Sequence, residues 1–515
     1  MLINELLEKT ARLYPDKEAL VCGRKRLTYA QIDIFSNRLA HAFLAYRLEK
    51  QERVGIYLEN CVESVISIYA TLKASGIFVV INPQTKPNKL AYILNDCSIK
   101  ILVTDTQHYT SAKEKFAECP NLKTIILIDS QDRKLNFYQI LDRFPASQPP
   151  KNCIDVDLAS LIYTSGSTGN PKGVMLTHLN MVSAINSITK YLENTPDDII
   201  IDCLPLSFDY GLYQILMAFS FGGKVILERS FTYPYQIIDL ILKEKVTGFP
   251  IVPAISAILL QLNNLNKYDF SCLRYITNTA QALPPKHIYR LKELFPHVKI
   301  FSMYGLTECK RVSYLEPELI TRKPTSVGKA MPNMEVWLVD EKGNRITQPN
   351  TIGELVIRGS QIMKGYWNQP ELTAQRLKPG LYGNEQILYS GDYFKMDEEG
   401  YLYFVSRKDD IIKTGGEMVS PKEVENVIYE LDDVVETAVV GVADDILGNV
   451  IKAFVVLKEK SFLDEKDIIL HCQKNLENFK VPKIIEFRKS LPKTPSGKIS
   501  KKLLSEGVVV DSAEI

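Results

Sequence analysis

The chain has 515 residues, of which 45% are hydrophobic and 24% charged, and its formal net charge is +1. This length is too great for one ordinary hydrophobic core, so at least two domains are expected. The balance is typical of a soluble globular protein, and it excludes both a strongly basic surface for nucleic acid and an acidic solvated tail.

The N-terminal stretch MLINELLEKTARLYPDKEAL has an amphipathic pattern that predicts a helix, without the apolar segment of a secretory signal. Nowhere does an apolar run reach the length of about 18 residues that a membrane-spanning helix needs. The nine cysteines and six histidines are dispersed, with no Cys-x-x-Cys pair. This favours reduced structural thiols over disulfides or a metal site. We therefore expect a cytoplasmic protein with no membrane and no nucleic-acid partner.

From Arg53 onward, apolar strands alternate with helical patterns. The strands are expected at 52–60, 77–83, 99–105 and 123–129, and again at 223–229, 247–253 and 273–279. Helices are expected at 62–76, where Gly76 ends the first, and at 89–97. Continuous apolar strands separated by amphipathic helices indicate parallel sheets covered on both faces. The first and largest part of the chain is thus predicted to be an α/β domain.

After about residue 300 the pattern changes to short strands at 334–340, 353–359 and 400–406, separated by turn residues, which indicates a β-rich subdomain. Beyond the polar cluster at 406–410, helix and strand patterns alternate as in a compact α+β unit. The predicted domains are residues 1–407, a large α/β domain with the β-rich subdomain, and residues 408–515, a small mobile α+β domain.

The most informative stretch is LIYTSGSTGNPKGVMLTH, residues 161–178, in which an apolar strand runs into a polar loop and then a helical pattern. Glycines allow tight turns that expose backbone N–H groups to phosphate oxygens, and hydroxyls add further donors. Lys172 adds a point charge for a β- or γ-phosphate. The loop is not a Walker A motif, and its alternative interpretation is an ordinary polar surface loop. The candidate phosphate ligands are Thr164, Ser165, Gly166, Ser167, Thr168, Gly169 and Lys172.

At this stretch the sequence resembles the superfamily of acyl-CoA synthetases, peptide-synthetase adenylation domains and luciferases, over nearly the whole chain. The resemblance implies an AMP-forming ligase that uses ATP and Mg²⁺ to convert an acid into an acyl-AMP and then passes the acyl group to a thiol. MYGLTE, residues 303–308, matches the family's second signature: Tyr304 would stack near adenine, Thr307 contact phosphate and Glu308 hold magnesium. A magnesium ion prefers such a carboxylate oxygen and offsets charge on the leaving pyrophosphate.

Later motifs complete this resemblance. By it, Asp392 accepts the ribose hydroxyls, Arg407 also reaches the ribose, and Asp409 is the hinge about which the small domain swings. Lys498, in PKTPSGK, matches the catalytic lysine, whose ammonium would bridge the attacking carboxylate and the α-phosphate. Thr164, Glu308 and Lys172 join it as catalytic residues. Without the resemblance, Gly391-Asp392 would be interpreted as a turn, and Lys498 as part of a basic tail.

The substrate prediction rests on LPLSFDYGLYQIL, residues 204–216. Amino-acid-activating domains carry Phe-Asp here, and Asp209 would pair with a substrate ammonium, because a carboxylate in a partly dry pocket needs a cation. The alternative is that Asp209 merely caps the following helix. FDYGLYQ, YITNTAQALP and MYGLTECKRVSYL together resemble free-standing prolyl-AMP ligases. Carried over from them, the pocket residues are Asp209, Tyr210, Tyr213, Pro250, Ile276, Asn278, Met303, Arg311 and Val312.

The resemblance implies L-proline as the substrate and the phosphopantetheine thiol of a separate carrier protein as the acceptor. Arg311 is unexpected beside an apolar ring and would suit a second acidic group on the substrate. Two alternatives stay open: an acyl-CoA synthetase for a small acid with free coenzyme A, and a non-catalytic nucleotide-binding protein.

Overall fold

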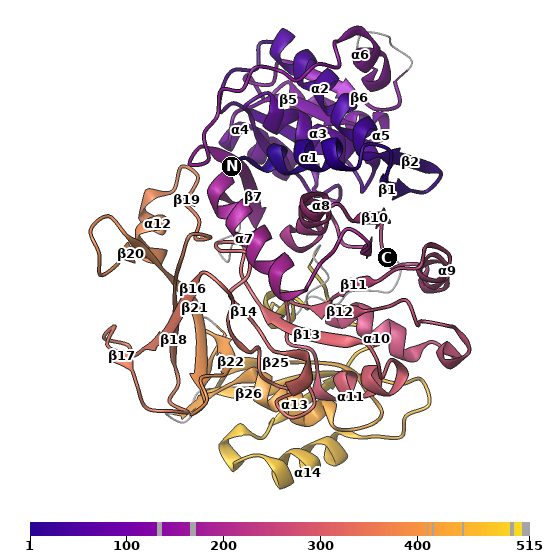
Figure 1. The fold of residues 1–515 in the computed structure, drawn as a ribbon. Helices are drawn as coiled ribbons and strands as arrows, with labels where there is room; N and C mark the ends of the chain where they lie inside the picture. The colour runs from indigo at the N-terminus through magenta and orange to yellow at the C-terminus, as the bar shows by residue number, and fades with distance from the viewer. Residues whose placement is uncertain are drawn as a thin grey trace.

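A computed structural model describes residues 1–130, 136–164, 171–408, 410–414, 417–444, 447–494 and 499–506, without the side chains of residues 413, 418 and 448. Figure 1 shows the N-terminal part of the chain in indigo at the top, the β-rich part in orange at the left and the C-terminal part in yellow at the bottom. Among the described residues, no helix is both long and apolar enough to cross a membrane.

Two mainly parallel sheets form the first part of the chain. One sheet has seven strands in the order β19 (Gly365–Tyr366), β8 (Lys172–Thr177), β7 (Leu158–Thr164), β4 (Ile77–Val80), β3 (Arg53–Tyr57), β5 (Ile99–Thr104) and β6 (Thr124–Leu127). The other has nine, in the order β15 (Lys329–Ala330), β14 (Ser313–Tyr314), β13 (Lys299–Tyr304), β12 (Tyr275–Asn278), β11 (Gly248–Ile251), β9 (Ile199–Asp202), β10 (Lys224–Leu227), β1 (Glu18–Cys22) and β2 (Lys25–Thr28).

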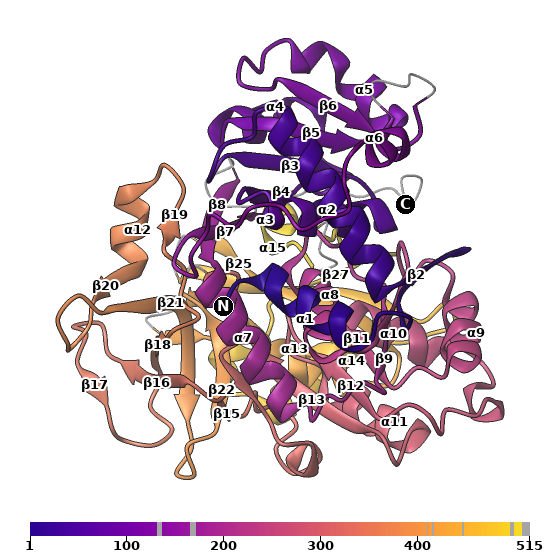
Figure 2. The ribbon, with the colours of Figure 1, turned by 45° about the horizontal axis from the view of Figure 1, so that its top comes forward.

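Helices lie between these sheets, as the rotated view in Figure 2 shows for α1, α7 and α8. The largest core cluster joins side chains of both sheets to side chains of this layer. The layer consists of α1 (Ile3–Leu13), α2 (Tyr29–Ala45), α3 (Val62–Lys73), α7 (His178–Tyr191) and α8 (Asp209–Phe221). The outer faces carry α4 (Pro87–Asp96), α5 (Thr106–Phe116), α9 (Pro234–Glu244), α10 (Pro253–Gln261) and α11 (Pro285–Leu294). Because sheet faces are apolar, this covering is the expected arrangement of parallel strands.

A third, antiparallel sheet forms the β-rich part. Its order is β17 (Arg345–Ile346), β16 (Met334–Val339), β18 (Gly353–Gly359), β21 (Gln386–Met396) and β20 (Leu377–Pro379), with β22 (Leu402–Arg407) paired to β21. Helix α12 (Pro370–Arg376) packs beside it. The register of β21 and β22 places Asp392 opposite Arg407.

The C-terminal part is smaller and has its own core cluster. It contains β23 (Ile412–Thr414), β24 (Glu417–Val419), α13 (Pro421–Tyr429), β25 (Val434–Asp444), β26 (Gly448–Leu457), α14 (Glu465–Asn475), β27 (Ile484–Phe487) and α15 (Lys501–Ser505). The α/β fold predicted from the sequence is confirmed. The division at residue 407 stays a prediction.

Two local expectations were wrong. Helix α3 ends at Lys73, before the predicted end at Gly76, and Ser75, with a φ of 62°, adopts a left-handed conformation. After the polar loop, Lys172 begins strand β8 instead of a helical segment, and the helix starts only at His178. Strand β8 pairs with β7 in antiparallel register, with Lys172 opposite Thr164. The lysine is therefore held at the start of β8, directly across from the residue that enters the loop.

Candidate active site

Several predicted site residues lie outside the described part of the chain: Ser165, Gly166, Ser167, Thr168, Gly169, Asp409 and Lys498. Both ends of the predicted phosphate loop are described, by Thr164 and Lys172. The roles predicted for all these residues stay predictions.

Tyr304, Asp392 and Arg407 come together from three strands. The Tyr304 hydroxyl donates to Asp392 Oδ2 at 2.6 Å, and Arg407 Nε lies 3.3 Å from Asp392 Oδ1. The Tyr304 ring packs edge-on against Phe394, with ring centroids 4.8 Å apart. Burial raises the pKa of Tyr304 well above its ordinary value, so its hydroxyl stays a donor. Sequence positions almost ninety residues apart thus build one polar cluster.

Asp392 has bonding capacity left for a ligand. Its Oδ1 is buried and accepts no hydrogen bond from the described residues, although Arg407 is near. Burial raises the pKa of Asp392, and the Arg407 charge opposes that shift. A buried carboxylate oxygen without a donor is costly, and a ribose hydroxyl would satisfy it. The cluster therefore fits the sugar of a nucleotide.

Lys172 and Glu308 meet through a residue that the sequence analysis did not single out. Tyr366, on β19, donates its hydroxyl to Glu308 Oε1 at 2.6 Å, and Lys172 Nζ lies over the Tyr366 ring, 5.6 Å from its centroid. The Met363 N–H donates to the Glu308 carbonyl at 2.7 Å. The predicted magnesium carboxylate and the predicted phosphate lysine are therefore neighbours.

The donor set around Glu308 suits magnesium bound together with a polyphosphate. No group of three or more His, Cys, Asp or Glu side chains in the described part of the chain is placed to hold a metal by itself. Magnesium is usually bound by one or two carboxylates plus substrate phosphates, so a single Glu308 is sufficient. Thr307, next to it, is half-buried in a turn.

Asp209 is buried and already has a cationic partner. It is the first residue of α8, and Phe208 is the N-cap, so the capping alternative is wrong. Lys310 Nζ lies 3.3 Å from Asp209 Oδ2 and donates to the Asp209 carbonyl at 2.7 Å. Lys310 is itself only 5% exposed. The carboxylate that was expected to bind a substrate ammonium is thus paired within the protein.

The other predicted pocket residues fall into two groups. Tyr213, Met303 and Val312 belong to the core cluster between the sheets, whereas Tyr210 and Ile276 belong to the second cluster. Tyr210 bonds to the Thr277 carbonyl at 2.9 Å.

Two further pocket positions are buried at strand ends. Pro250 is in β11, opposite Thr277 of β12. Asn278, at the end of β12, donates to the Gln281 carbonyl at 3.0 Å, and its buried Oδ1 has no partner among the described residues. The bond from Tyr210 to Thr277 joins the N-terminal part of α8 to strand β12.

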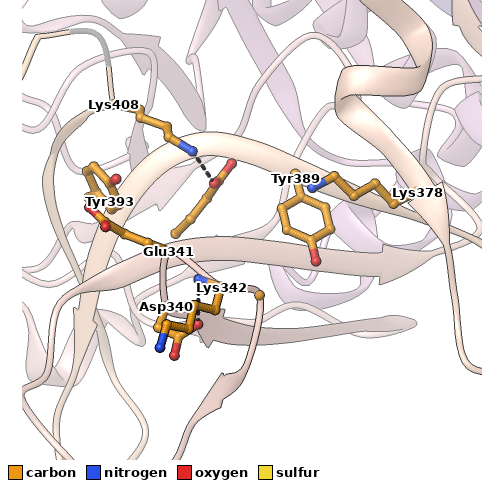
Figure 3. A pocket seen from close by; sticks show the side chains of 9 residues that line it. Asp340, Glu341, Lys342, Lys378, Tyr389, Tyr393 and Lys408 are labelled. Carbon is orange, nitrogen blue, oxygen red and sulfur yellow. Dashed lines mark hydrogen bonds and ion pairs between the residues drawn. The ribbon is translucent and has the colours of Figure 1, made fainter.

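A surface hollow lies beside the strand that leads to the small domain (Figure 3). It is lined by Asp340, Glu341, Lys342, Gly343, Glu354, Lys378, Tyr389, Tyr393 and Lys408. The dashed line at Lys408 marks its ion pair with Glu354, at 3.0 Å. The Lys408 N–H also donates to the Gly391 carbonyl at 2.9 Å. The chain is thus anchored immediately before the predicted hinge.

Comparison with known families identifies the chain. Residues 7–367 match the AMP-binding enzyme family, and residues 423–498 match the AMP-binding enzyme C-terminal domain. The chain belongs to the AMP-binding enzymes. These adenylate-forming enzymes use ATP with Mg²⁺, as the sequence predicted.

Relatives of this AMP-binding enzyme include CoA ligases. A long-chain-fatty-acid–CoA ligase of Bacillus subtilis (strain 168) is 33% identical over 98% of this chain and 94% of its own length. The anthranilate CoA ligase AuaEII, solved with anthranoyl-AMP, gives a TM-score of 0.91 at 28% identity, over 98% of this chain and 97% of that one. ATP-bound MatB from Rhodopseudomonas palustris gives a TM-score of 0.90 at 27% identity, over 98% and 99%. AMP-forming acid–thiol ligase activity is therefore shown, whereas a prolyl carrier-protein ligase is not.

Two functional candidates were missed by sequence reasoning. Tyr366 lies in KGYWNQPELT, outside the motifs named from the sequence, and only its position beside Glu308 reveals it. Lys310 stands in the quoted stretch MYGLTECKRV, but its partner Asp209 is far away in sequence. The adjacent cations at 310 and 311, directly after a predicted active-site motif, were the signal that could have found it.

Proposed function

We propose that this chain is an AMP-forming acid–CoA ligase. It joins a carboxylic acid to the α-phosphate of ATP, releasing pyrophosphate, and then transfers the acyl group to the thiol of coenzyme A, releasing AMP. The Asp209–Lys310 ion pair is the observation that favours this function over that of an amino-acid ligase. An amino-acid substrate needs a carboxylate for its ammonium, and here that carboxylate already has a cation.

Two supports are independent of the pocket. The relative and the AuaEII structure described above are named as CoA ligases, and each is covered over nearly its whole length. The polar clusters around Asp392 and Glu308 supply the ribose acceptor and the magnesium carboxylate that the first half-reaction needs.

The proposal assigns a role to each set of predicted site residues. Thr164, Lys172, Thr307 and the loop 165–169 hold the phosphates, while Tyr304, Asp392 and Arg407 hold the nucleoside end. Glu308 would hold the magnesium ion, which would offset the charge of the departing pyrophosphate. Lys498 neutralises charge that grows at the α-phosphate. Residues 408–515 act as a mobile domain that turns about Asp409 between the half-reactions.

The test is a product assay with the purified chain, ATP, Mg²⁺ and coenzyme A. Aliphatic, aromatic and dicarboxylic acids are compared by pyrophosphate release, and the thioester is identified by mass spectrometry. In a parallel arm, L-proline is offered with a phosphopantetheinylated carrier protein. We expect acyl-CoA from at least one acid and no prolyl-carrier. Loading of the carrier with proline, without any acyl-CoA, would reverse the proposal.

A further inference from the structure

Arg311 is a buried cation without a charge partner. Its side chain belongs to the largest fully buried ones, at 1% exposure, and it forms no ion pair with the residues that the structure describes. Its Nε has no hydrogen-bond partner among them, and Nη1 donates only to Met303 Sδ, at 3.3 Å. The guanidinium lies over the Tyr210 ring, 5.2 Å from its centroid. A sulfur atom and an aromatic face compensate poorly for the lost hydration of a full charge.

The neighbouring charges do not remove this imbalance. Asp209 is paired with Lys310, so two cations face one paired carboxylate. The next carboxyl group, Asp202, is fully buried, and burial raises its pKa well above the ordinary value, which favours its uncharged form. An anion that entered this region would therefore be attracted by an uncompensated positive charge.

The backbone conformation directs the side chains of Lys310 and Arg311 towards the same helix, α8. Lys310 has a φ of 61°, a left-handed conformation that side chains other than glycine rarely adopt. In an extended chain, consecutive side chains point to opposite faces. Here both Lys310 and Arg311 lie against α8: Lys310 Nζ is 4.2 Å from the Tyr213 ring centroid and 5.7 Å from that of Tyr210. Backbone strain of this kind is typical of sites that bind ligands.

Arg311 lies close to the cluster of Tyr304, Asp392 and Arg407. Met303, which its guanidinium contacts, directly precedes Tyr304, whose hydroxyl bonds to Asp392. The guanidinium therefore lies next to the end of β13, the strand that carries the predicted adenine residue, and over the Tyr210 ring of α8.

We propose that Arg311 binds a second anionic group on the acyl substrate, so that the preferred acids are dicarboxylates. The planar guanidinium can bind a carboxylate through two parallel hydrogen bonds, and Nε is one of the donors that such a contact uses. One carboxylate of the acid is activated at ATP while the other pairs with Arg311. This inference rests on the proposed acid–CoA ligase activity and names its substrate class.

The test compares acids of equal chain length with and without the second carboxylate: succinate with butyrate, and glutarate with valerate. The wild-type enzyme is expected to show a kcat/KM at least about 100-fold higher for the diacid, because a monoacid leaves the buried guanidinium unpaired. Arg311→Met should lose about that factor on the diacid and keep or improve its rate on the monoacid. Arg345→Met serves as the matched control, because Arg345 lies over Trp337, 5.7 Å from its ring centroid, on a different sheet.

The outcomes separate the two proposals. If the wild type makes butyryl- or valeryl-CoA and rejects both diacids, the inference about Arg311 is wrong and the ligase proposal stands. If no acid yields an acyl-CoA, the ligase proposal fails first. Equal losses on both acids in Arg311→Met would assign Arg311 a structural role only. Should that variant fail to fold, the wild-type selectivity decides, together with an increase in Tm of the wild type with succinate that butyrate does not give.

Discussion

Removing one partner of the buried Asp209–Lys310 pair should destabilise the protein more than removing both. The pKa of Lys310 falls from 10.5 to about 8, because burial lowers it more than Asp209 raises it. A shift of that size corresponds to about 3 kcal/mol against the charged form. Asp209→Asn removes the attraction between the Asp209 carboxylate and the Lys310 ammonium. Breaking a buried ion pair typically lowers the free energy of unfolding by about 3–5 kcal/mol. Lys310→Met strands the carboxylate instead.

The double variant Asp209→Asn with Lys310→Met removes both charges. Replacing a whole buried ion pair is neutral or stabilising by about 1–4 kcal/mol. If about 400 residues unfold together, each single variant should lower Tm by about 4–6 °C, and the double variant should match or exceed the wild type. The control is the exposed pair Glu193–Lys299, at 2.8 Å, with the same substitutions, which should leave Tm within about 1 °C.

The pH dependence gives a second measurement on the same variants. The pKa of Lys310 in the folded protein, about 8, lies below its ordinary value of 10.5, so between these values the unfolded chain holds more protons. The contribution of Lys310 to the free energy of unfolding therefore rises with pH between its folded and unfolded pKa values, by at most about 1.4 kcal/mol per pH unit. The advantage of the double variant over the wild type should shrink between pH 8 and pH 10 in thermal unfolding scans. Additive Tm losses in the double variant, with no such convergence, would refute the reasoning.

Four further outcomes are expected. Asp392→Asn should raise the KM for ATP in pyrophosphate release, because it weakens a charged acceptor for ribose; unchanged ATP kinetics would contradict this. Tyr366→Phe should raise the Mg²⁺ concentration needed for half-maximal rate, since Glu308 loses the hydroxyl that orients it; a magnesium titration checks this. Lys498→Ala should slow acyl-AMP formation by about 10²–10³ while thioester formation from supplied acyl-AMP persists, and near-normal ATP–pyrophosphate exchange would count against it. Asp409→Pro should spare adenylation and block thioester formation, whereas equal rates for both half-reactions would exclude a hinge there.

The fold was largely predictable, because long apolar strands and amphipathic helices carry a strong periodic signal. The errors fell where that signal is short. Strand β8 has only six residues and follows directly on the polar loop, so its pairing with β7, which decides its conformation, is invisible in the sequence. At the end of α3, Ser75 adopts the left-handed conformation next to a glycine that would have taken it at lower cost.

The sequence identified residues of the candidate site only where they belong to a motif. Tyr304, Asp392 and Arg407 were named from motifs, and the structure brings them into contact. The pairing of Asp209 was not predictable, because its partner Lys310 is about a hundred residues away and sequence shows charge without proximity. That contact changes the substrate hypothesis from an amino acid to a carboxylic acid without an ammonium group. Predicting specificity therefore requires knowing which residues are neighbours in the fold.

In the proposed mechanism, the anchoring of Lys408 sets where a rotation of the C-terminal part would begin. Its side chain is tied to Glu354 and its backbone to Gly391, next to Asp392. A rotation of the C-terminal part would therefore be absorbed beyond residue 408, and the proposed pivot would lie close to the cluster of Tyr304, Asp392 and Arg407. Atoms near a pivot move little and distant atoms move far, so a rotation about Asp409 would displace α14 and leave Arg407 beside the predicted ribose site. If the C-terminal part turns as proposed, different residues of that part would face the active site in the two half-reactions while the nucleotide stays bound.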